Sequence, residues 1–331
     1  MSQALIGDKT SHSSAEHWDA FWRARDKAVP QPDAGARDPA PAEFWHEFLK
    51  QEFALYEHPR LIDIACGNGA VTAIAMEAAH RTGASLTAHC VDYSISAVEE
   101  LRKRFPQVEG VACDAREMPY DDRSFDLVVS QFGIEYAGVE AFEEAARLVD
   151  TNGVLAAIVH MADGAIEKEC AANLAVVEAL NEAQLMPLAR AAFGAGFDLI
   201  AGKITDPDFQ QFDKQLAPAI DVAKKILQDE GPLAAGGLLA NLYRDIAYMY
   251  TRMQNYVPEE VFAWIDQMSD ELVSYEGRMA SMTHCAVDEA TITEIAERVA
   301  PLGFTVQPRD VLSLRKTGKA AAWILIARRV A

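Results

Sequence analysis

Short apolar runs alternate with longer amphipathic segments between residues 61 and 159. The apolar runs have the length of buried strands, and the segments between them repeat their hydrophobic positions with helical spacing. The pattern predicts strands at 61–65, 86–91, 108–112, 125–130 and 154–159, and helices at 71–81, 95–105 and 139–149. Such alternation predicts an α/β fold with a doubly wound, mostly parallel sheet.

A long helical pattern then interrupts the strands. Residues 162–282 contain no clear strand pattern, and their apolar spacing predicts helices at 164–183, 187–201, 207–229, 233–255 and 258–282. This stretch is too long to be a simple connection between strands. We therefore expect an all-α inserted subdomain, which is either a cap over the strand ends or a dimerisation element.

The two ends of the chain complete this division into four parts. Residues 1–59 form an N-terminal helical segment with predicted helices at 14–22 and 42–56, whose aromatic side chains either pack or form a lid. Residues 60–161 form the core, and residues 162–282 the insertion. Residues 283–331 complete the sheet, with a helix at 288–302 and strands at 304–306 and 321–327. The predicted sheet thus has seven strands.

A glycine-rich loop follows the first predicted strand, in the segment DIACGNG at 63–69. Gly67 and Gly69 allow a ligand to approach the main chain, and the next helix presents its unpaired N–H groups to that ligand. The dinucleotide fingerprint requires a small residue where Thr72 stands. Asp63 would repel a pyrophosphate and attract an ammonium group. The loop therefore favours a zwitterionic or cationic cofactor, and a nicotinamide-dependent oxidoreductase is the weaker alternative.

Two further acids stand at the ends of the next strands. Asp92 ends the second strand, where a carboxylate accepts hydrogen bonds from ribose hydroxyls; Asp114 follows the third, where it accepts from an exocyclic amine such as that of adenine. Each acid by itself has an alternative role as a helix or turn cap. Together with Asp63, they indicate a nucleoside site along one edge of the sheet.

The segment 61–159 resembles the core of the class I S-adenosylmethionine-dependent methyltransferases of the small-molecule type. The resemblance rests on DIACGNG, VDYS, CDAREMPYDDRSFDLVVSQFGIEY and TNGVLAAIV. It implies a Rossmann-like sheet whose last strand inserts antiparallel between strands five and six. It also implies transfer of a methyl group from S-adenosyl-L-methionine to a small organic acceptor.

The resemblance further assigns contacts to the methyl donor. The implied contacts are Asp63, Ala65, Gly67 and Gly69 around the methionine part, Asp92 at the ribose, Tyr93 near the adenine, Asp114 and Ala115 at the adenine edge, and Gln131 beside the sulfonium. Ala65 stands where the family often has glycine, and its small size is compatible with the same loop.

Candidates for acceptor chemistry follow strands four and five. Methyl transfer needs in-line positioning, and an acceptor with a hydroxyl or protonated amine also needs a general base. His160 ends strand five and is the first candidate, and its alternative role is to cap the strand end or to be hydrogen-bonded in the subdomain interface. Tyr136 and Glu135 are the next candidates, and His284 is expected to be structural. Because no catalytic residue is unambiguous, a non-catalytic scaffold that binds S-adenosylmethionine is an alternative function.

Composition restricts the classes of partner and ligand that we expect for this chain. A net charge of -20 argues against a nucleic-acid substrate. The five cysteines are scattered, without a CxxC pair, so we expect no metal site and no disulfide framework. No apolar run has the length of a membrane span, and the first residues lack a secretory signal pattern, which predicts a cytoplasmic protein. The expected partners are a small-molecule substrate and a second copy bound through the helical insertion.

Overall fold

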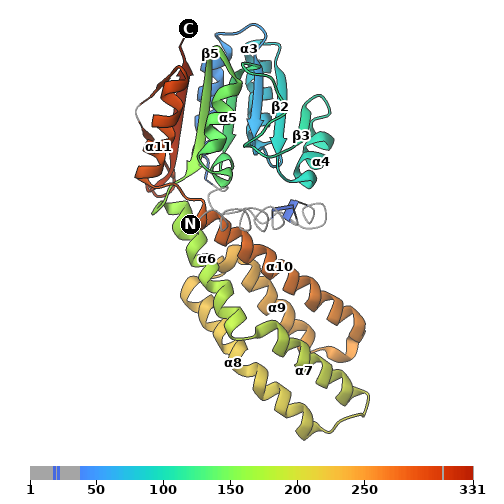
Figure 1. Ribbon diagram of the computed structural model, residues 1–331. Helices are drawn as coiled ribbons and strands as arrows, with labels where there is room; N and C mark the ends of the chain where they lie inside the picture. The colour runs from blue at the N-terminus through green and yellow to red at the C-terminus, as the bar shows by residue number, and fades with distance from the viewer. Residues whose placement is uncertain (1–17, 20, 23–37, 308, 331) are drawn as a thin grey trace, which may run out of the picture. The chain divides into compact units, whose positions relative to one another are not determined.

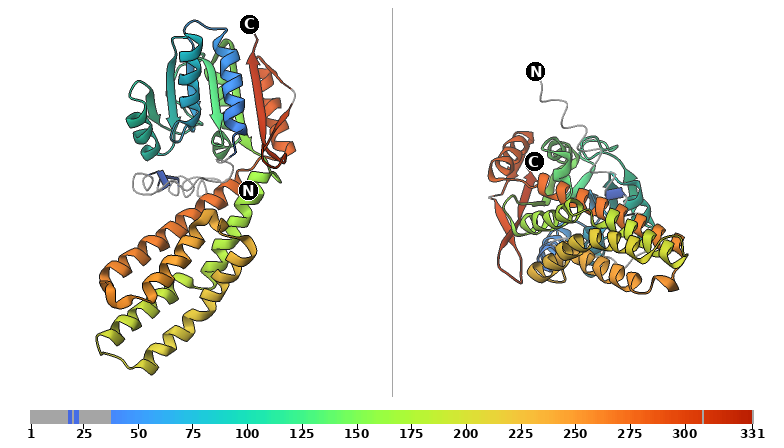
Figure 2. Two further views of the ribbon diagram at one scale, coloured as in Figure 1. Left: turned by 180° about the vertical axis from the view of Figure 1, so that it is seen from behind. Right: turned by 90° about the horizontal axis from the view of Figure 1, so that it is seen from below.

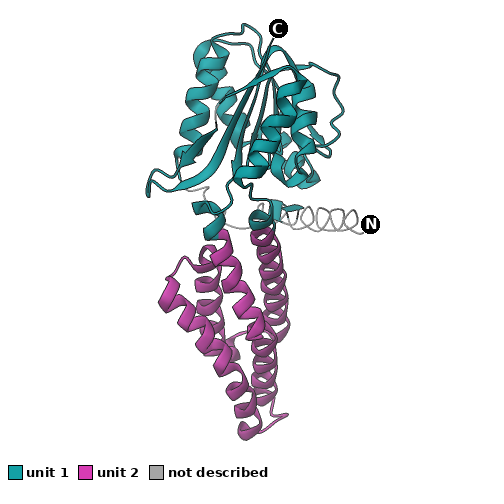
Figure 3. Cartoon of the chain, turned by 60° about the vertical axis from the view of Figure 1, so that its left-hand side comes forward, with its two compact units in different colours: residues 1–30, 34–169, 281–331 teal, residues 31–33, 170–280 magenta. Residues whose placement is uncertain are grey.

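The structure is a computed structural model that describes residues 18–19, 21–22, 38–307 and 309–330. Its chain divides into two compact units, shown in different colours in Figure 3. Among the described residues, the second unit comprises residues 170–280, and the others belong to the first. Most of the predicted helix 14–22, and most of residues 30–41 before the next predicted helix, lie outside the described residues, but Trp18, Asp19, Phe21 and Trp22 are helical.

The first unit is built on a mostly parallel sheet. Its strand order is β3-β2-β1-β4-β5-β8-β6, and β7 also pairs with β8 (Figure 1). The strands are β1 Arg60–Ile64, β2 Thr87–Asp92, β3 Glu109–Ala112, β4 Phe125–Gln131, β5 Val149–His160, β6 Phe304–Val306, β7 Asp310–Ser313 and β8 Ala320–Arg329. The pairs β3-β2, β2-β1, β1-β4 and β4-β5 are parallel, while β8 is antiparallel to β5 and β6. The predicted fold class and the insertion of the last strand are confirmed.

The edge beside β8 differs from the prediction of seven strands. Within the described chain the sheet has eight strands, and the sequence pattern missed β7. β6 pairs with residues 327–329 of β8, and β7 pairs with residues 320–324 on that same edge. The two short strands therefore share the seventh position of the sheet. Four residues with only two buried or half-buried side chains are too short to give a strand pattern.

The segment DTNG at 150–153 has the composition of a turn, but a turn is wrong because these residues belong to β5. β5 already pairs with β4 at Val149, and the register shifts before the pairing resumes at Val154. Asn152 lies inside this irregularity with a φ of 64°, in the left-handed region that asparagine tolerates better than most residues. The polar residues that indicated a turn form a bulge within one long strand.

Helices cover both faces of the sheet (Figures 1 and 2). On one face α2 and α3 pack against Leu61 of β1, and α4 extends this layer beside β2. On the other face α5 and α11 pack against Ile62 and Ile64. The helices are α2 Ala40–Phe53, α3 Ala70–Thr82, α4 Ile95–Arg104, α5 Glu140–Leu148 and α11 Glu289–Val299, with short 3-10 helices η1 Ile134–Ala137 and η4 Ala300–Leu302. Because both faces are covered, the central strands are nearly all apolar.

The second unit is entirely helical. The helices between β5 and α11 are α6 Ala165–Glu182, α7 Leu185–Ile200, α8 Asp206–Glu230, α9 Leu238–Tyr250 and α10 Pro258–His284, with η2 Ala234–Gly237 and η3 Met253–Asn255. Aromatic rings from several of these helices form its interior, including Phe193 against Tyr250 at 5.3 Å. A single helix at 233–255 is wrong, because Ala235 and Gly236 have positive φ and α9 begins only after them. No helix in the described residues has the length and apolarity to cross a bilayer.

Candidate functional site

The carboxyl ends of β1 and β4 carry unusual backbone geometry. Ala65 and Phe132 directly follow these neighbouring strands and have φ values of 53° and 55°. Left-handed geometry at a residue other than glycine costs about 1–2 kcal/mol and concentrates at functional sites. Gly133 is also required here, because a Cβ on it would lie 2.3 Å from the Cβ of Ala65. The strand edge is therefore held in a strained, close-packed form.

The glycine loop is hydrogen-bonded to the carboxyl end of β2. Asp92 accepts a hydrogen bond from the Gly67 amide at 2.8 Å and another from the Ser94 amide at 2.8 Å. Burial raises the pKa of its carboxyl group. Each carboxylate oxygen has two lone pairs, so Asp92 retains acceptor capacity beyond these amides. The predicted ribose residue thus lies against the loop that was predicted to bind the same ligand.

Asp63 lies beneath the loop. It is 1% exposed, and its Oδ2 accepts from the amide of Thr72 at 3.1 Å and from the hydroxyl of Thr72 at 2.7 Å. Thr72 is the third residue of α3, so the acid anchors the first turn of that helix. Thr72, which does not fit the dinucleotide fingerprint, is therefore the hydrogen-bond partner of Asp63. Burial raises the pKa of Asp63 to about 7.

We expect Asp63→Asn to make the free energy of unfolding less dependent on pH. The unfolded carboxyl ionises near its ordinary pKa of 3.8 and the folded one near 7, so Asp63 stabilises the fold at low pH and loses that contribution as pH rises through 7. Since one pKa unit is worth about 1.4 kcal/mol, the variant gains up to about 4 kcal/mol at pH 8 relative to pH 4. Urea titrations at several pH values measure this.

Asp288→Asn is the matched control, with the opposite sign. Hydrogen bonds from Thr291 lower the pKa of this exposed cap, so its removal costs stability at neutral pH and little in acid. A pH profile of stability for Asp63→Asn that is parallel to that of the unsubstituted protein would contradict the raised pKa.

The predicted adenine residues lie at the ends of β2 and β3. Tyr93 is 49% exposed, whereas Ala115 packs against the core. Asp114 forms a fork-shaped ion pair with Arg116, whose Nη2 lies 2.6 Å from Asp114 Oδ2. The carboxylate also accepts from the Arg116 amide at 2.8 Å. A ligand amine would share the Asp114 carboxylate with this arginine, a partner that the sequence reasoning did not assign.

Gln131 ends β4 and is held by a residue far away in the sequence. The indole N–H of Trp45 in α2 donates to Gln131 Oε1 at 2.8 Å. Trp45 is completely buried, so its indole has a fixed position. This bond orients the side-chain amide of Gln131 at the strand edge.

The N-terminal residues that are described lie on the same edge. The ring of Trp22 lies 2.7 Å from the point that a Cβ on Gly67 would occupy. Asp19 accepts from the hydroxyl of Ser94 at 2.8 Å, and Trp18 makes an edge contact with Tyr136, with ring centroids 6.1 Å apart. The described aromatic residues Trp22 and Trp18 therefore lie against the glycine loop and the loop after β4.

Part of the chain is similar in sequence to known proteins. Residues 61–153 match the family described as "Methyltransferase domain". A methyltransferase of Schizosaccharomyces pombe is 28% identical over 121 residues, covering 36% of this chain and 46% of that protein. A demethylmenaquinone methyltransferase of a Mycobacterium strain is 31% identical over 157 residues, covering 47% and 62%. These findings show that this part of the chain is similar to methyltransferase domains.

The similarity to methyltransferases covers only part of this chain and part of each relative. The chain spans less than two thirds of the curated relatives it matches. Among solved structures, the geranyl diphosphate C-methyltransferase of Streptomyces coelicolor, in complex with Mg²⁺, geranyl diphosphate and S-adenosyl-L-homocysteine, is similar with a TM-score of 0.42 and 12% identity. That similarity covers 87% of this chain and 79% of the other.

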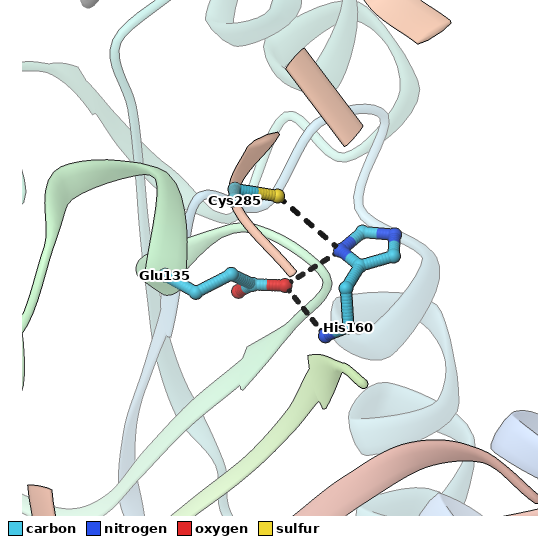
Figure 4. Close-up of side chains that lie close together, drawn as sticks. All are labelled: Glu135, His160 and Cys285. Carbon is cyan, nitrogen blue, oxygen red and sulfur yellow. Dashed lines mark hydrogen bonds and ion pairs between the residues drawn. The ribbon is translucent and has the colours of Figure 1, made fainter. Parts of the chain in front are cut away.

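A buried cluster of side chains lies at the end of β5 and is drawn in Figure 4. Glu135 Oε1 accepts from the backbone amide of His160 at 2.9 Å and lies 2.7 Å from His160 Nδ1. The imidazole packs against Phe132, with ring centroids 4.6 Å apart, and against Tyr136, at 6.0 Å. Two of the predicted candidates, Glu135 and His160, thus form one pair, and Tyr136 borders it.

Cys285 completes the cluster, and the sequence reasoning missed it. His284 is exposed at the end of α10, whereas the Cys285 sulfur lies 3.8 Å from His160 Nδ1. The Val287 amide donates to the His160 carbonyl at 2.8 Å, which holds this segment against β5. Cysteine, histidine and carboxylate within 4.8 Å also form a candidate metal-binding group. No local pattern brings position 285 to position 160.

Proposed function

We propose that this protein transfers a methyl group from S-adenosyl-L-methionine to a small organic acceptor. The observation that carries the proposal is the position of Asp92, which ends β2 and accepts from the Gly67 amide of the glycine loop. A nucleoside with a charged amino-acid group needs an acid for its ribose next to a loop with exposed amides. The match of residues 61–153 to methyltransferase domains supports the same chemistry.

The strand edge would hold the donor through its own polar groups. Asp92 accepts from the ribose hydroxyls, Tyr93 packs on the adenine, and Asp114 with Ala115 contacts the adenine edge. The loop at Ala65, Gly67 and Gly69 surrounds the methionine part. Asp63 contacts the donor ammonium through Oδ1, since Oδ2 is occupied by Thr72. When bound, S-adenosylmethionine supplies an electrophilic methyl group on a sulfonium.

His160 and Tyr136 would act on the acceptor side. His160 ends β5, next to the β4 end that carries Gln131, and serves as the general base for the acceptor. Tyr136 borders the imidazole and lines the acceptor position. Gln131 lies beside the sulfonium and helps to keep the nucleophile and the methyl carbon in line.

Two measurements test the proposal. Calorimetry with S-adenosylmethionine should show one binding site per chain, and a metabolite extract incubated with the protein and the donor should contain a product heavier by one methyl group. Failure to bind the donor would contradict the function. Donor binding without formation of S-adenosylhomocysteine in any extract would favour the non-catalytic scaffold.

Trp45→Phe should weaken donor binding without changing the fold. The substitution removes one hydrogen bond and leaves Gln131 without its anchor, so we expect an affinity about threefold to tenfold lower. Calorimetry with S-adenosylmethionine measures it. In a Gln131→Met background the same substitution should have no further effect, and additive losses would contradict the role of this bond.

We also propose a substrate class, a location and a role for the helical unit. The acidic chain acts on a small molecule in the cytoplasm and not on nucleic acid. Its helical unit, residues 170–280, either caps the site or joins two copies. Sedimentation of the full chain with and without donor distinguishes these two roles, since only the second gives a dimer.

A further inference from the structure

We infer that Glu135 is a positioning residue that fixes the tautomer of His160, so that Nε2 accepts the proton of the methyl acceptor. The inference rests on the proposed function and deepens it. It also defines the substrate class, because an acceptor that needs this base must carry a proton on its reacting atom.

The contacts of one carboxylate oxygen carry the inference. Glu135 Oε1 accepts from the His160 backbone amide at 2.9 Å and lies 2.7 Å from His160 Nδ1. An ionised carboxylate only accepts hydrogen bonds, so both contacts are hydrogen bonds only if Nδ1 also carries a hydrogen. With Nδ1 protonated, the lone pair of the neutral ring is on Nε2. The backbone contact fixes the ring position, and the side-chain contact fixes the proton.

The buried position of Glu135 is costly for an acidic side chain. Its side chain is 1% exposed and that of His160 is 2% exposed. Both hydrogen bonds of the Glu135 carboxylate to described residues go to His160, and Oε2 has none. Burying a carboxylate costs several kcal/mol, and a neutral side chain would avoid that cost. An acid in this position is useful because it stabilises the imidazolium that forms when the ring takes a proton.

The contacts of Cys285 favour this interpretation over a metal centre. Its sulfur lies 3.8 Å from Nδ1, the same nitrogen that contacts Glu135. The thiol donates to the carbonyl of Met282 at 3.5 Å, which is the contact of a protonated thiol. A metal ion on Nδ1 would need a deprotonated thiol and a ring without hydrogen on that nitrogen. Among the described residues, the titratable groups that contact the imidazole are Glu135 and Tyr136 from η1 and Cys285 from the segment after α10.

Proton transfer to His160 accompanies the transfer of the methyl group to the acceptor. The acceptor gives its proton to Nε2 of His160, and its lone pair forms the bond to the methyl carbon. The carbon–sulfur bond breaks with its electron pair left on sulfur, which becomes a neutral thioether. The imidazolium then holds the proton beside Glu135 until it passes to solvent. Acceptors of this class are hydroxyl compounds, protonated nitrogen compounds and carbon acids, while thioethers and simple alkenes fall outside it.

Nitrogen NMR of the full chain with isotope-labelled histidine reads the tautomer directly and needs no acceptor. We expect His160 to carry hydrogen on Nδ1 in the unsubstituted protein and in Glu135→Gln, whose amide oxygen keeps both contacts. In Glu135→Leu we expect the tautomers to mix. Hydrogen on Nε2 in the unsubstituted protein, or one tightly bound zinc ion per chain, would overturn the inference.

Transfer of label from methyl-labelled S-adenosylmethionine to a metabolite extract gives the second readout. Loss of the charge should lower kcat by about 10- to 100-fold in Glu135→Gln with little change in KM for the donor. An unchanged kcat would overturn the positioning role. Calorimetry with S-adenosylmethionine distinguishes failure of the proposed function from failure of this inference. Absent donor binding contradicts the proposed function, while the NMR measurement of the tautomer tests the inference independently.

Discussion

We expect His160→Gln to lower the turnover of methyl transfer by about 10²- to 10⁴-fold, the range that a general base contributes. The glutamine side chain approaches the size of the imidazole and can still hydrogen-bond to Glu135, but it accepts no proton at neutral pH. Because the ring lies at the end of β5 against Phe132 and Tyr136, its loss should affect the chemical step and not donor binding. Transfer of label from S-adenosylmethionine to a metabolite extract measures turnover, and calorimetry measures donor binding.

His89→Gln is the matched control for this experiment. His89 is a half-buried histidine of β2 that packs against Tyr120 and Phe125. It has no contact with the Glu135–His160 pair among those described, so its substitution should change stability slightly and turnover little. Equal losses of turnover in the two variants would show that a change in folding, and not the loss of a base, explains the result.

Asp92→Ala should reduce the affinity for S-adenosylmethionine by about 10²- to 10⁴-fold. Each hydrogen bond from a ribose hydroxyl to a carboxylate is worth about 1.5–3 kcal/mol, and the proposal assigns two of them to Asp92. The substitution also leaves the amides of Gly67 and Ser94 without their acceptor. Both effects weaken the loop that would surround the methionine part.

Asp92→Asn separates these two effects. Its amide oxygen can still accept from a loop amide, so the loop should keep its structure while the ribose loses the charged acceptor. We expect an intermediate affinity for Asp92→Asn with an unchanged circular dichroism spectrum. Donor binding that is unchanged in both variants would contradict the placement of the ribose at the end of β2.

The α/β core could be predicted because its signals are local. Each central strand is buried on both faces and therefore apolar over its whole length, while each flanking helix repeats its apolar positions with helical spacing. The strands and helices between Leu61 and His160 agree with the prediction to within a few residues at most ends. The bulge at 150–153 and the short strand β7 were missed because polar residues in a strand have the composition of a turn.

The candidate donor residues were also accessible from the sequence. Asp63, Asp92 and Asp114 stand in or directly after three successive parallel strands, and parallel strands bring their carboxyl ends to one edge. The position of each acid in or after its own strand was therefore enough to predict that the three lie at one edge. It did not reveal that Thr72 occupies one oxygen of Asp63 or that Arg116 pairs with Asp114.

The sequence by itself determined the layered fold and the strand edge at which we expect a ligand to bind, since hydrophobic period and strand-end position are properties of neighbouring residues. Only the tertiary structure decided which side chains support that edge. Trp45 reaches Gln131 across 86 positions, and Cys285 reaches His160 across 125. Such contacts depend on how strands and helices pack, and no local pattern records them. The pairing of Glu135 with His160 likewise appears only when β4 and β5 lie side by side.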